Sequence, residues 1–338
     1  MDDASAVNWG GTLRAPLITA FILPMSLVSS LGMNDTRTAP PQSETRAGIA
    51  SGLAAYLLWG SITVFWKLLS DFNAFELIGW RIVTAVVLLL ALVTAQRRIG
   101  HVVTALRNPR LLVRIVAASL LLVTNWTLYV WAVVNEHIIE TALGYFIAPL
   151  LTALLGVLVL GEKLRRLQRV ALGFAVAAVV VLTFTYGQPP FVALAIAASW
   201  AVYGLLKKNV PLRPVDSLTA ETLVLVPGAI GLMVWSFTRT DGIPTTASAS
   251  QMVLVLLTGL ITAVPLLFFA HSALRLPLTL IGPLQYLVPV INFLLGWLAY
   301  DEPLEATRFA GFLLVWCGLV FSLVDTMRSR AQLAPPTK

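Results

Sequence analysis

The sequence has 338 residues, of which 58% are hydrophobic and only 12% are charged, and its formal net charge is +7. The charged share is about half of the roughly 25% that is usual in soluble domains, and the mean hydropathy is +0.85, so lipid must solvate most of the chain. The single cysteine, Cys317, excludes an intrachain disulfide, and motifs for nucleotide binding, zinc hydrolysis or a nucleophilic serine are absent.

The first 47 residues contain an apolar run at 15–32 and a polar stretch at 34–46. Prolines interrupt the apolar run, and the polar stretch is typical of a disordered tail. Three interpretations stay open: a further span, a cleaved or weak anchor, or an over-extended start with Met33 as the true first residue. We therefore treat residues 1–47 as an N-terminal extension.

The rest of the chain predicts ten transmembrane helices joined by short loops. A bilayer core about 30 Å thick requires about 20 apolar residues of helix. The fold class expected is therefore an all-α polytopic membrane protein. The predicted spans are approximately 48–68, 75–95, 112–134, 139–160, 166–185, 190–207, 217–238, 251–271, 277–299 and 306–326.

Lysine and arginine are distributed unevenly between the predicted loops. They gather in the even-numbered loops and in the tail at 327–338, whereas the odd-numbered loops contain few of them. Cytoplasmic loops carry such an excess. We expect a multi-pass protein of the cell (inner) membrane, with both ends of the ten-helix body and the tail in the cytoplasm.

One segment of the sequence is repeated 140 residues later. Pro149–Leu164 and Pro289–Leu304 are identical at seven of sixteen positions. The repeat divides the body into two five-helix halves, 48–185 and 190–326. Because five is odd, the second half would be inserted upside down relative to the first, as in many secondary transporters.

Two residue types in the repeat are candidates for a conformational role. Pro149 and Pro289 are expected near the middle of helices four and nine, where a lost backbone hydrogen bond loosens a helix. Gly156 and Gly296 follow two turns later and allow close helix approach. Packing alone is the alternative for each of these residues.

A glutamate closes each copy of the repeat. Glu162 and Glu302 both precede a leucine and are expected to open the following helix, where an acid complements the positive end of the helix dipole. We favour this structural role over substrate binding.

Charged residues within predicted spans indicate a cavity or a partner, because a charge in the bilayer core is costly. Arg81 and Glu221 lie at similar depths in helices two and seven and are again 140 residues apart. They could pair across the pseudo-twofold axis or hold substrate between them. Alternatively, each extends to an interface.

Further polar and aromatic side chains are expected near the centre of the bundle, where buried amides and phenols need partners. Proton coupling would need a carboxylate there, for which Glu140 and Glu221 are the candidates. Helix-end residues without transport function are the alternative. With Arg81 and Glu221, the predicted substrate-binding residues are Asn125, Tyr129, Glu140, Tyr145, Gln285 and Asn292.

Three blocks of the sequence, Asn125–Leu164, Ala220–Pro227 and Thr262–Gly296, resemble RarD-type proteins of the EamA branch of the drug/metabolite transporter superfamily. The resemblance spans nearly all of residues 48–326. It implies an inner-membrane carrier with ten helices and internal duplication. Since relatives move amino acids, nucleotide sugars and cationic drugs, it leaves the substrate class open.

The function expected is secondary transport, with export of a small metabolite or drug-like solute by alternating access. A channel or a sensor without turnover is one alternative, and an intramembrane lipid-modifying enzyme is another. The expected partners are a small solute, the bilayer and an ion such as a proton, with no nucleic acid. We expect no cofactor, no metal site and no enzymatic activity.

Overall fold

The computed structural model describes residues 42–161, 165–207, 210–276, 281 and 283–333. Every regular element within these ranges is a helix, which confirms the all-α class. The apolar run at 15–32, Met33 and Glu162 lie outside the described residues, so the predictions made for them stay open.

Eight helices are long and apolar enough to cross a membrane, so this is an integral membrane protein. Two shorter apolar helices accompany them, α8 (Phe191–Lys207) and the pair α13 (Leu287–Leu294) and η2 (Leu295–Ala299), where η2 is a π-helical turn. Two further helices, α4 (Ile99–Arg107) and α10 (Ile243–Thr246), lie in connections. The eight long helices are α2 (Gln42–Lys67), α3 (Ala74–Ala95), α5 (Pro109–Val134), α6 (Ile138–Leu160), α7 (Arg166–Tyr186), α9 (Pro214–Thr238), α11 (Ala249–Arg275) and α14 (Ala306–Leu333).

The ninth predicted span, 277–299, differs most from the structure. Gln285 and Tyr286 form a turn, and α13 begins only at Leu287. Pro289 therefore lies in the first turn of α13 and not near the middle of a helix. Proline is favoured in a first turn because its nitrogen needs no helical hydrogen-bond partner there.

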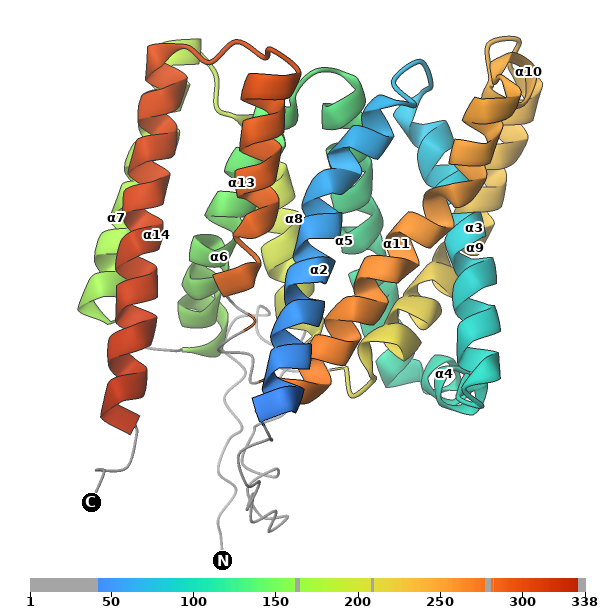
Figure 1. Ribbon diagram of the computed structural model, residues 1–338, viewed down its shortest axis with the longest axis horizontal. Helices are drawn as coiled ribbons and strands as arrows, with labels where there is room; N and C mark the ends of the chain where they lie inside the picture. Colours follow the sequence, from blue (N-terminus) through green and yellow to red (C-terminus); the bar gives the residue numbers. More distant parts are fainter. Residues whose placement is uncertain (1–41, 162–164, 208–209, 277–280, 282, 334–338) are drawn as a thin grey trace, which may run out of the picture. The chain divides into compact units, whose positions relative to one another are not determined.

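The helices pack in a definite set of neighbours. The α3 helix contacts α9 and α11, α2 contacts α11 and α13, and α6 contacts α8 and α13. The α5 helix contacts α8 and α9, while α7 and α14 lie side by side at one edge (Figure 1). Both the start of α2 and the end of α14 lie at the same end of the bundle (Figure 1).

Glycines bring two of these helix pairs into backbone contact. A Cβ on Gly259 of α11 would lie 2.6 Å from the backbone nitrogen of Ala85 on α3. A Cβ on Gly144 of α6 would lie 2.7 Å from the carbonyl oxygen of Ala193 on α8. Such close approach between membrane helices is typical of small residues, and it holds α11 against the segment of α3 that carries Arg81.

Candidate functional site

The side chain of Arg81 lies where four helices meet. The amide of Asn73 caps the start of α3, and Arg81 follows two turns later, with only 6% of its surface exposed. Its Nε donates a hydrogen bond to Oγ1 of Thr262 on α11, at 3.0 Å. The guanidinium carbon lies 4.0 Å from the ring centroid of Trp126 on α5 and 5.4 Å from that of Trp66 on α2. Aromatic faces therefore stabilise this charge on more than one side.

Arg81 does not pair with Glu221. The carboxylate of Glu221 instead accepts hydrogen bonds from Nζ of Lys207 at 2.6 Å, from the hydroxyl of Ser217 at 2.8 Å and from the hydroxyl of Tyr203 at 3.0 Å. Within the described residues, no carboxylate lies within 4.0 Å of the Arg81 guanidinium. The cause is topological, since equal depths in two antiparallel helices place residues at opposite ends.

A chain of hydrogen bonds begins next to this arginine. Tyr129 of α5 donates to Oγ1 of Thr63 on α2, at 2.7 Å, and Thr63 donates to Oδ1 of Asn292 on α13, at 2.8 Å. Asn292 then donates from Nδ2 to Oγ1 of Thr141 on α6, at 3.2 Å. All four side chains are buried, so these bonds satisfy groups that lipid could not.

A second set of hydrogen bonds joins α6 to α5 and α8. Tyr145 donates to Oδ1 of Asn125 at 3.0 Å, and Asn125 donates from Nδ2 to the carbonyl of Ile196 and to the hydroxyl of Ser199. The ring of Tyr145 meets Trp200 edge to face, with centroids 6.2 Å apart. The ring centroids of Tyr129 and Tyr145 are 6.0 Å apart, so the two sets adjoin.

The structure thus brings five of the eight predicted substrate-binding residues into one region, which we call the Arg81 cluster. It comprises Arg81, Asn125, Tyr129, Tyr145 and Asn292, together with Thr63, Trp66, Trp126, Thr141, Ser199 and Thr262. Sequence analysis missed the threonines and the serine. A hydroxyl in an apolar helix usually bonds to the preceding turn of its own helix, so no sequence signal marks those that reach across.

Three predicted residues remain outside these hydrogen bonds. Glu140, in the first turn of α6, is half-buried and has no side-chain partner among the described residues. Gln285, in the turn before α13, is half-buried and also forms no side-chain hydrogen bond to the part of the chain that the structure describes. Glu221 forms the ion pair with Lys207 described above.

The repeated glycine and glutamate meet the start of α6. A Cβ on Gly296 would lie 2.8 Å from the side chain of Ile139. The carboxylate of Glu302 accepts hydrogen bonds from the backbone nitrogens of Ile138 and Ile139, at 2.6 and 2.8 Å. Glu302 therefore caps α6, and the prediction that it opens the following helix is wrong, because α14 begins at Ala306.

The other two conformational candidates lie within α6 itself. Pro149 is half-buried inside the helix, as expected for a mid-span proline, and Gly156 is buried two turns later. Their transport role stays a prediction.

Two ion pairs join α3 to α9, one at each end. Buried Asp216, in the first turn of α9, binds both Nε and Nη2 of Arg98, which follows α3. Buried Glu76, in the first turn of α3, pairs with Arg239, which follows α9, and accepts hydrogen bonds from the hydroxyl of Ser236 and the amide nitrogen of Ile243. The carboxylates are 140 residues apart and the arginines 141. Hydrogen bonding to Asp216 also raises the pKa of Arg98.

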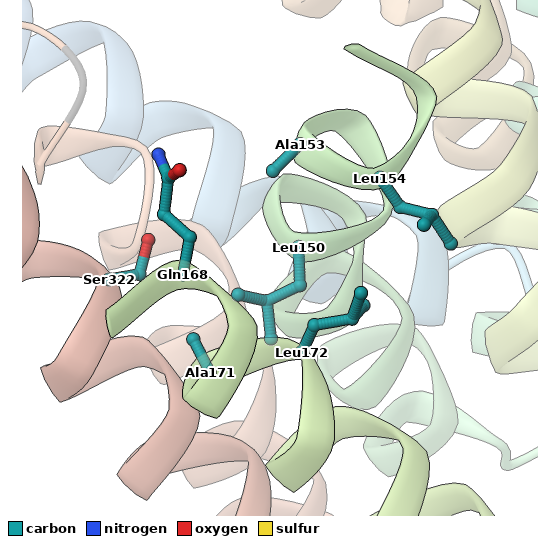
Figure 2. A pocket seen from close by; sticks show the side chains of 7 residues that line it. All are labelled: Leu150, Ala153, Leu154, Gln168, Ala171, Leu172 and Ser322. Atoms are coloured by element: carbon teal, nitrogen blue, oxygen red, sulfur yellow. The ribbon is translucent and has the colours of Figure 1, made fainter. Parts of the chain in front are cut away.

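Two cavities lie away from the Arg81 cluster. Figure 2 shows the first, between α6, α7 and α14, with a volume of about 10 Å³, which is enough for a single water at most. It is lined by Leu150, Ala153, Leu154, Gln168, Ala171, Leu172 and Ser322. The second is an open groove of about 500 Å³ beside α4, lined by Arg97, Gly100, His101, Thr104, Ala105, Asn108, Leu111 and Leu212.

Comparison with known proteins gives consistent matches over most of the chain. The profile of the EamA-like transporter family matches twice, at residues 46–184 and 189–324. A protein named Protein RarD from Streptomyces exfoliatus is 42% identical over 88% of this chain and 96% of its own length. The uncharacterized transporter YojE of Bacillus subtilis (strain 168) is 36% identical over 85% of this chain and 98% of its own.

A crystal structure with 20% sequence identity aligns with a TM-score of 0.54, covering 84% of this chain and 99% of the other. At that identity the match supports the fold alone.

Proposed function

Because the chain belongs to the EamA-like transporter family and is of the RarD type, we propose that it is a secondary transporter that exports a small metabolite or drug-like solute by alternating access. The observation that carries this proposal is that the packing of the helices is nearly unchanged when the two halves are exchanged. Such internal symmetry is the basis of alternating access in many secondary transporters.

The exchange pairs α2 with α8, α3 with α9, α5 with α11, α6 with α13 and α7 with α14. Under it, the α2–α11 contact becomes α8–α5, α2–α13 becomes α8–α6, and α3–α11 becomes α9–α5. The α3–α9, α6–α13 and α7–α14 contacts map onto themselves. This supports two inverted five-helix repeats at 48–185 and 190–326, in which α8 and α13–η2 complete a set of ten spans.

The ion pairs of the α3–α9 helices fit two alternately opening ends. Exchange of the halves converts Glu76–Arg239 into Asp216–Arg98, so each end of the same helix pair is closed by equivalent chemistry. A carrier must open one end while the other stays closed. We assign the Asp216–Arg98 pair to the cytoplasmic end, because basic loops mark that side and the basic α4 region follows Arg98 directly.

The solute site proposed is the Arg81 cluster, which contains residues from both halves. Arg81, Asn125, Tyr129 and Tyr145 come from the first half, and Asn292 from the second. Coupling to a proton would most directly use Glu140, whose carboxylate has no partner among the described residues, whereas Glu221 is held by Lys207.

The experiment that tests transport does not require a known solute. Full-length protein is reconstituted into liposomes preloaded with a metabolite extract, and the same extract, isotopically labelled, is added outside. Mass spectrometry then follows each labelled solute. We expect saturable counterflow of at least one solute, with a transient accumulation that protein-free liposomes do not show.

The alternatives give different outcomes in the same assay. A channel equilibrates solutes without counterflow, and a sensor moves none. A lipid-modifying enzyme changes the lipid composition, which the same spectra report. Absence of counterflow for every solute from correctly folded protein would reject the transporter proposal.

A further inference from the structure

The buried charges of this protein do not balance within the chain. Each buried carboxylate of the described residues has a donor: an arginine or lysine in four cases and two backbone amides in the fifth. These carboxylates are Glu76, Asp216, Glu221, Glu302 and Asp325. By contrast, Arg81 is the single buried base among the side chains that the structure describes, and it has no carboxylate partner there.

Hydrogen-bond donors next to this charge are also unused. Of the donors of Arg81, only Nε is engaged, by Thr262, and the two Nη groups have no hydrogen-bond partner in the described ranges. Trp66, which is fully buried beside the guanidinium, has an indole Nε1–H without an acceptor among the same residues. Buried donors normally have partners, and the chemical group that satisfies a cation and an N–H together is an anionic oxygen acceptor.

The geometry of Arg81 favours a carboxylate in particular. Its guanidinium is stacked on Trp126, with the carbon 4.0 Å from the ring centroid. Stacking occupies a face of the planar group and leaves its edge, which carries the Nη donors, free to bind a carboxylate in a bidentate way. The aromatic contact and the anion contact are therefore compatible.

The surroundings restrict the rest of the ligand. Trp126, Tyr129 and Tyr145 provide aromatic surface around Arg81, which suits an apolar or aromatic body. No second base is buried with Arg81 in the described part of the chain, which argues against a dianion. Every buried carboxylate described is already paired, which argues against a ligand ammonium group and hence against a zwitterion.

We propose that the solute of this transporter is a monocarboxylate with an apolar or aromatic body. This inference rests on the transport function proposed above. The carboxylate binds the Nη edge of Arg81 and the indole N–H of Trp66, and the body packs against Trp126 and Tyr129. Arg81 thereby selects for one negative charge, and the aromatic side chains select for the body.

Binding is tested directly, without transport, on the purified full-length chain in detergent at constant chloride concentration. Five phenyl compounds of similar size serve as probes in thermal unfolding: 3-phenylpropionate, its neutral amide, the cation 3-phenylpropylamine, zwitterionic phenylalanine and dianionic phenylsuccinate. Since a ligand that binds the folded state raises Tm by mass action, we expect a concentration-dependent increase with 3-phenylpropionate and little or none with the other four.

Variants locate the binding site. Arg81→Gln should weaken 3-phenylpropionate binding by about tenfold or more, as expected when a charged hydrogen-bond donor is lost, and Arg81→Lys should bind at an intermediate level. Arg110→Gln is the matched control, because Arg110 is exposed, and it should bind like the wild type. If Arg81→Gln does not fold, Trp66→Phe, which removes the indole N–H and keeps an aromatic ring, should also weaken binding.

Several outcomes would overturn the proposal. They are equal stabilisation by the neutral amide or the cation, stronger stabilisation by the zwitterion or the dianion, binding that survives in both Arg81→Gln and Trp66→Phe, and no stabilisation by 3-phenylpropionate. The counterflow assay separates this failure from failure of the proposed function. Counterflow of solutes that are not monocarboxylates would reject the solute class and keep the transporter, whereas absence of all counterflow would reject the transporter.

Discussion

Glu302 illustrates how a residue in a repeated motif acts far from its own helix. It lies just before α14, yet its carboxylate accepts hydrogen bonds from two amides at the start of α6, more than 160 residues earlier in the chain. Those amides have no partner within their own helix, and the negative charge also complements the positive end of the helix dipole. The glutamate therefore joins the two halves of the protein.

Removal of this cap should lower stability. We expect Glu302→Ala to reduce the free energy of unfolding by about 1–2 kcal/mol, the upper range for loss of an N-terminal helix cap, and hence to lower the Tm in detergent. Glu305→Ala is the control, since Glu305 is exposed and lies three residues away. Equal Tm values for the two variants would contradict the capping role.

The hydroxyl of Thr63 is a second point where one atom matters. It links Tyr129 to Asn292, and all three side chains are buried. Thr63→Val keeps the shape but leaves two polar groups unsatisfied, at a cost of about 1–3 kcal/mol. Thr124→Val provides the comparison, because the Thr124 hydroxyl is exposed and bonds only within its own helix. A Tm for Thr63→Val that matches that of Thr124→Val would show that the link does not contribute to stability.

At the scale of the elements, contacts between helix backbones set the geometry of the Arg81 cluster. Arg81 reaches Thr262 because α11 approaches α3 closely at Gly259, one turn before Thr262. Thr84 and Thr258, one turn from these residues, share a hydrogen bond of 3.0 Å across the same interface. Spacing between α3 and α11 therefore controls how the arginine is oriented.

Adding a methyl group at this interface should separate the two helices. A Cβ on Gly259 would meet backbone atoms of Thr84 and Ala85, and backbone cannot move aside as a flexible side chain can. We expect Gly259→Ala to destabilise the protein by about 1–3 kcal/mol, as overpacking generally does. Gly173→Ala in α7, which meets open space, should leave Tm unchanged or raise it. A Gly259→Ala variant as stable as Gly173→Ala would mean that the interface is looser than described.

At the scale of the whole molecule, the two halves are related by exchange, and the α3–α9 pair lies on the axis of that exchange. Its two ends carry buried carboxylates held by arginines that follow the partner helix. Breaking a buried pair by removing one partner is costly, because an uncompensated charge remains. Each pair therefore stabilises closure of its own end, and movement between states must exchange one for the other.

Charge reversal tests this role of the ion pairs. We expect Asp216→Arg and Arg98→Asp, each alone, to reduce the counterflow rate by about tenfold or more, since a buried like-charge contact costs over 1.4 kcal/mol. The double exchange restores opposite charges and should recover a large part of the rate. Arg110→Gln again serves as the surface control. Single variants with wild-type counterflow would show that the pair is not needed for the cycle.

Much of the architecture could be predicted from the sequence, because lipid imposes a simple rule on it. Helix existence and apolar length follow from runs of about 20 residues, and eight of the ten predicted spans satisfy the criteria for crossing a membrane. The ninth was placed less well, because proline and glycine around Gln285 replace continuous helix by a turn, and a hydropathy pattern does not show this. The 140-residue repeat is likewise visible only along the chain.

The sequence by itself determined that lipid is the solvent, that the elements are helices and that Arg81 and Glu221 are equivalent positions, since each of these depends on residue type and spacing. Only the tertiary structure decided the partners. Antiparallel packing separates Arg81 from Glu221, places Lys207 next to Glu221 and leaves Arg81 against Trp126 without a carboxylate. Contacts between residues far apart in sequence depend on how helices cross, which no local pattern encodes.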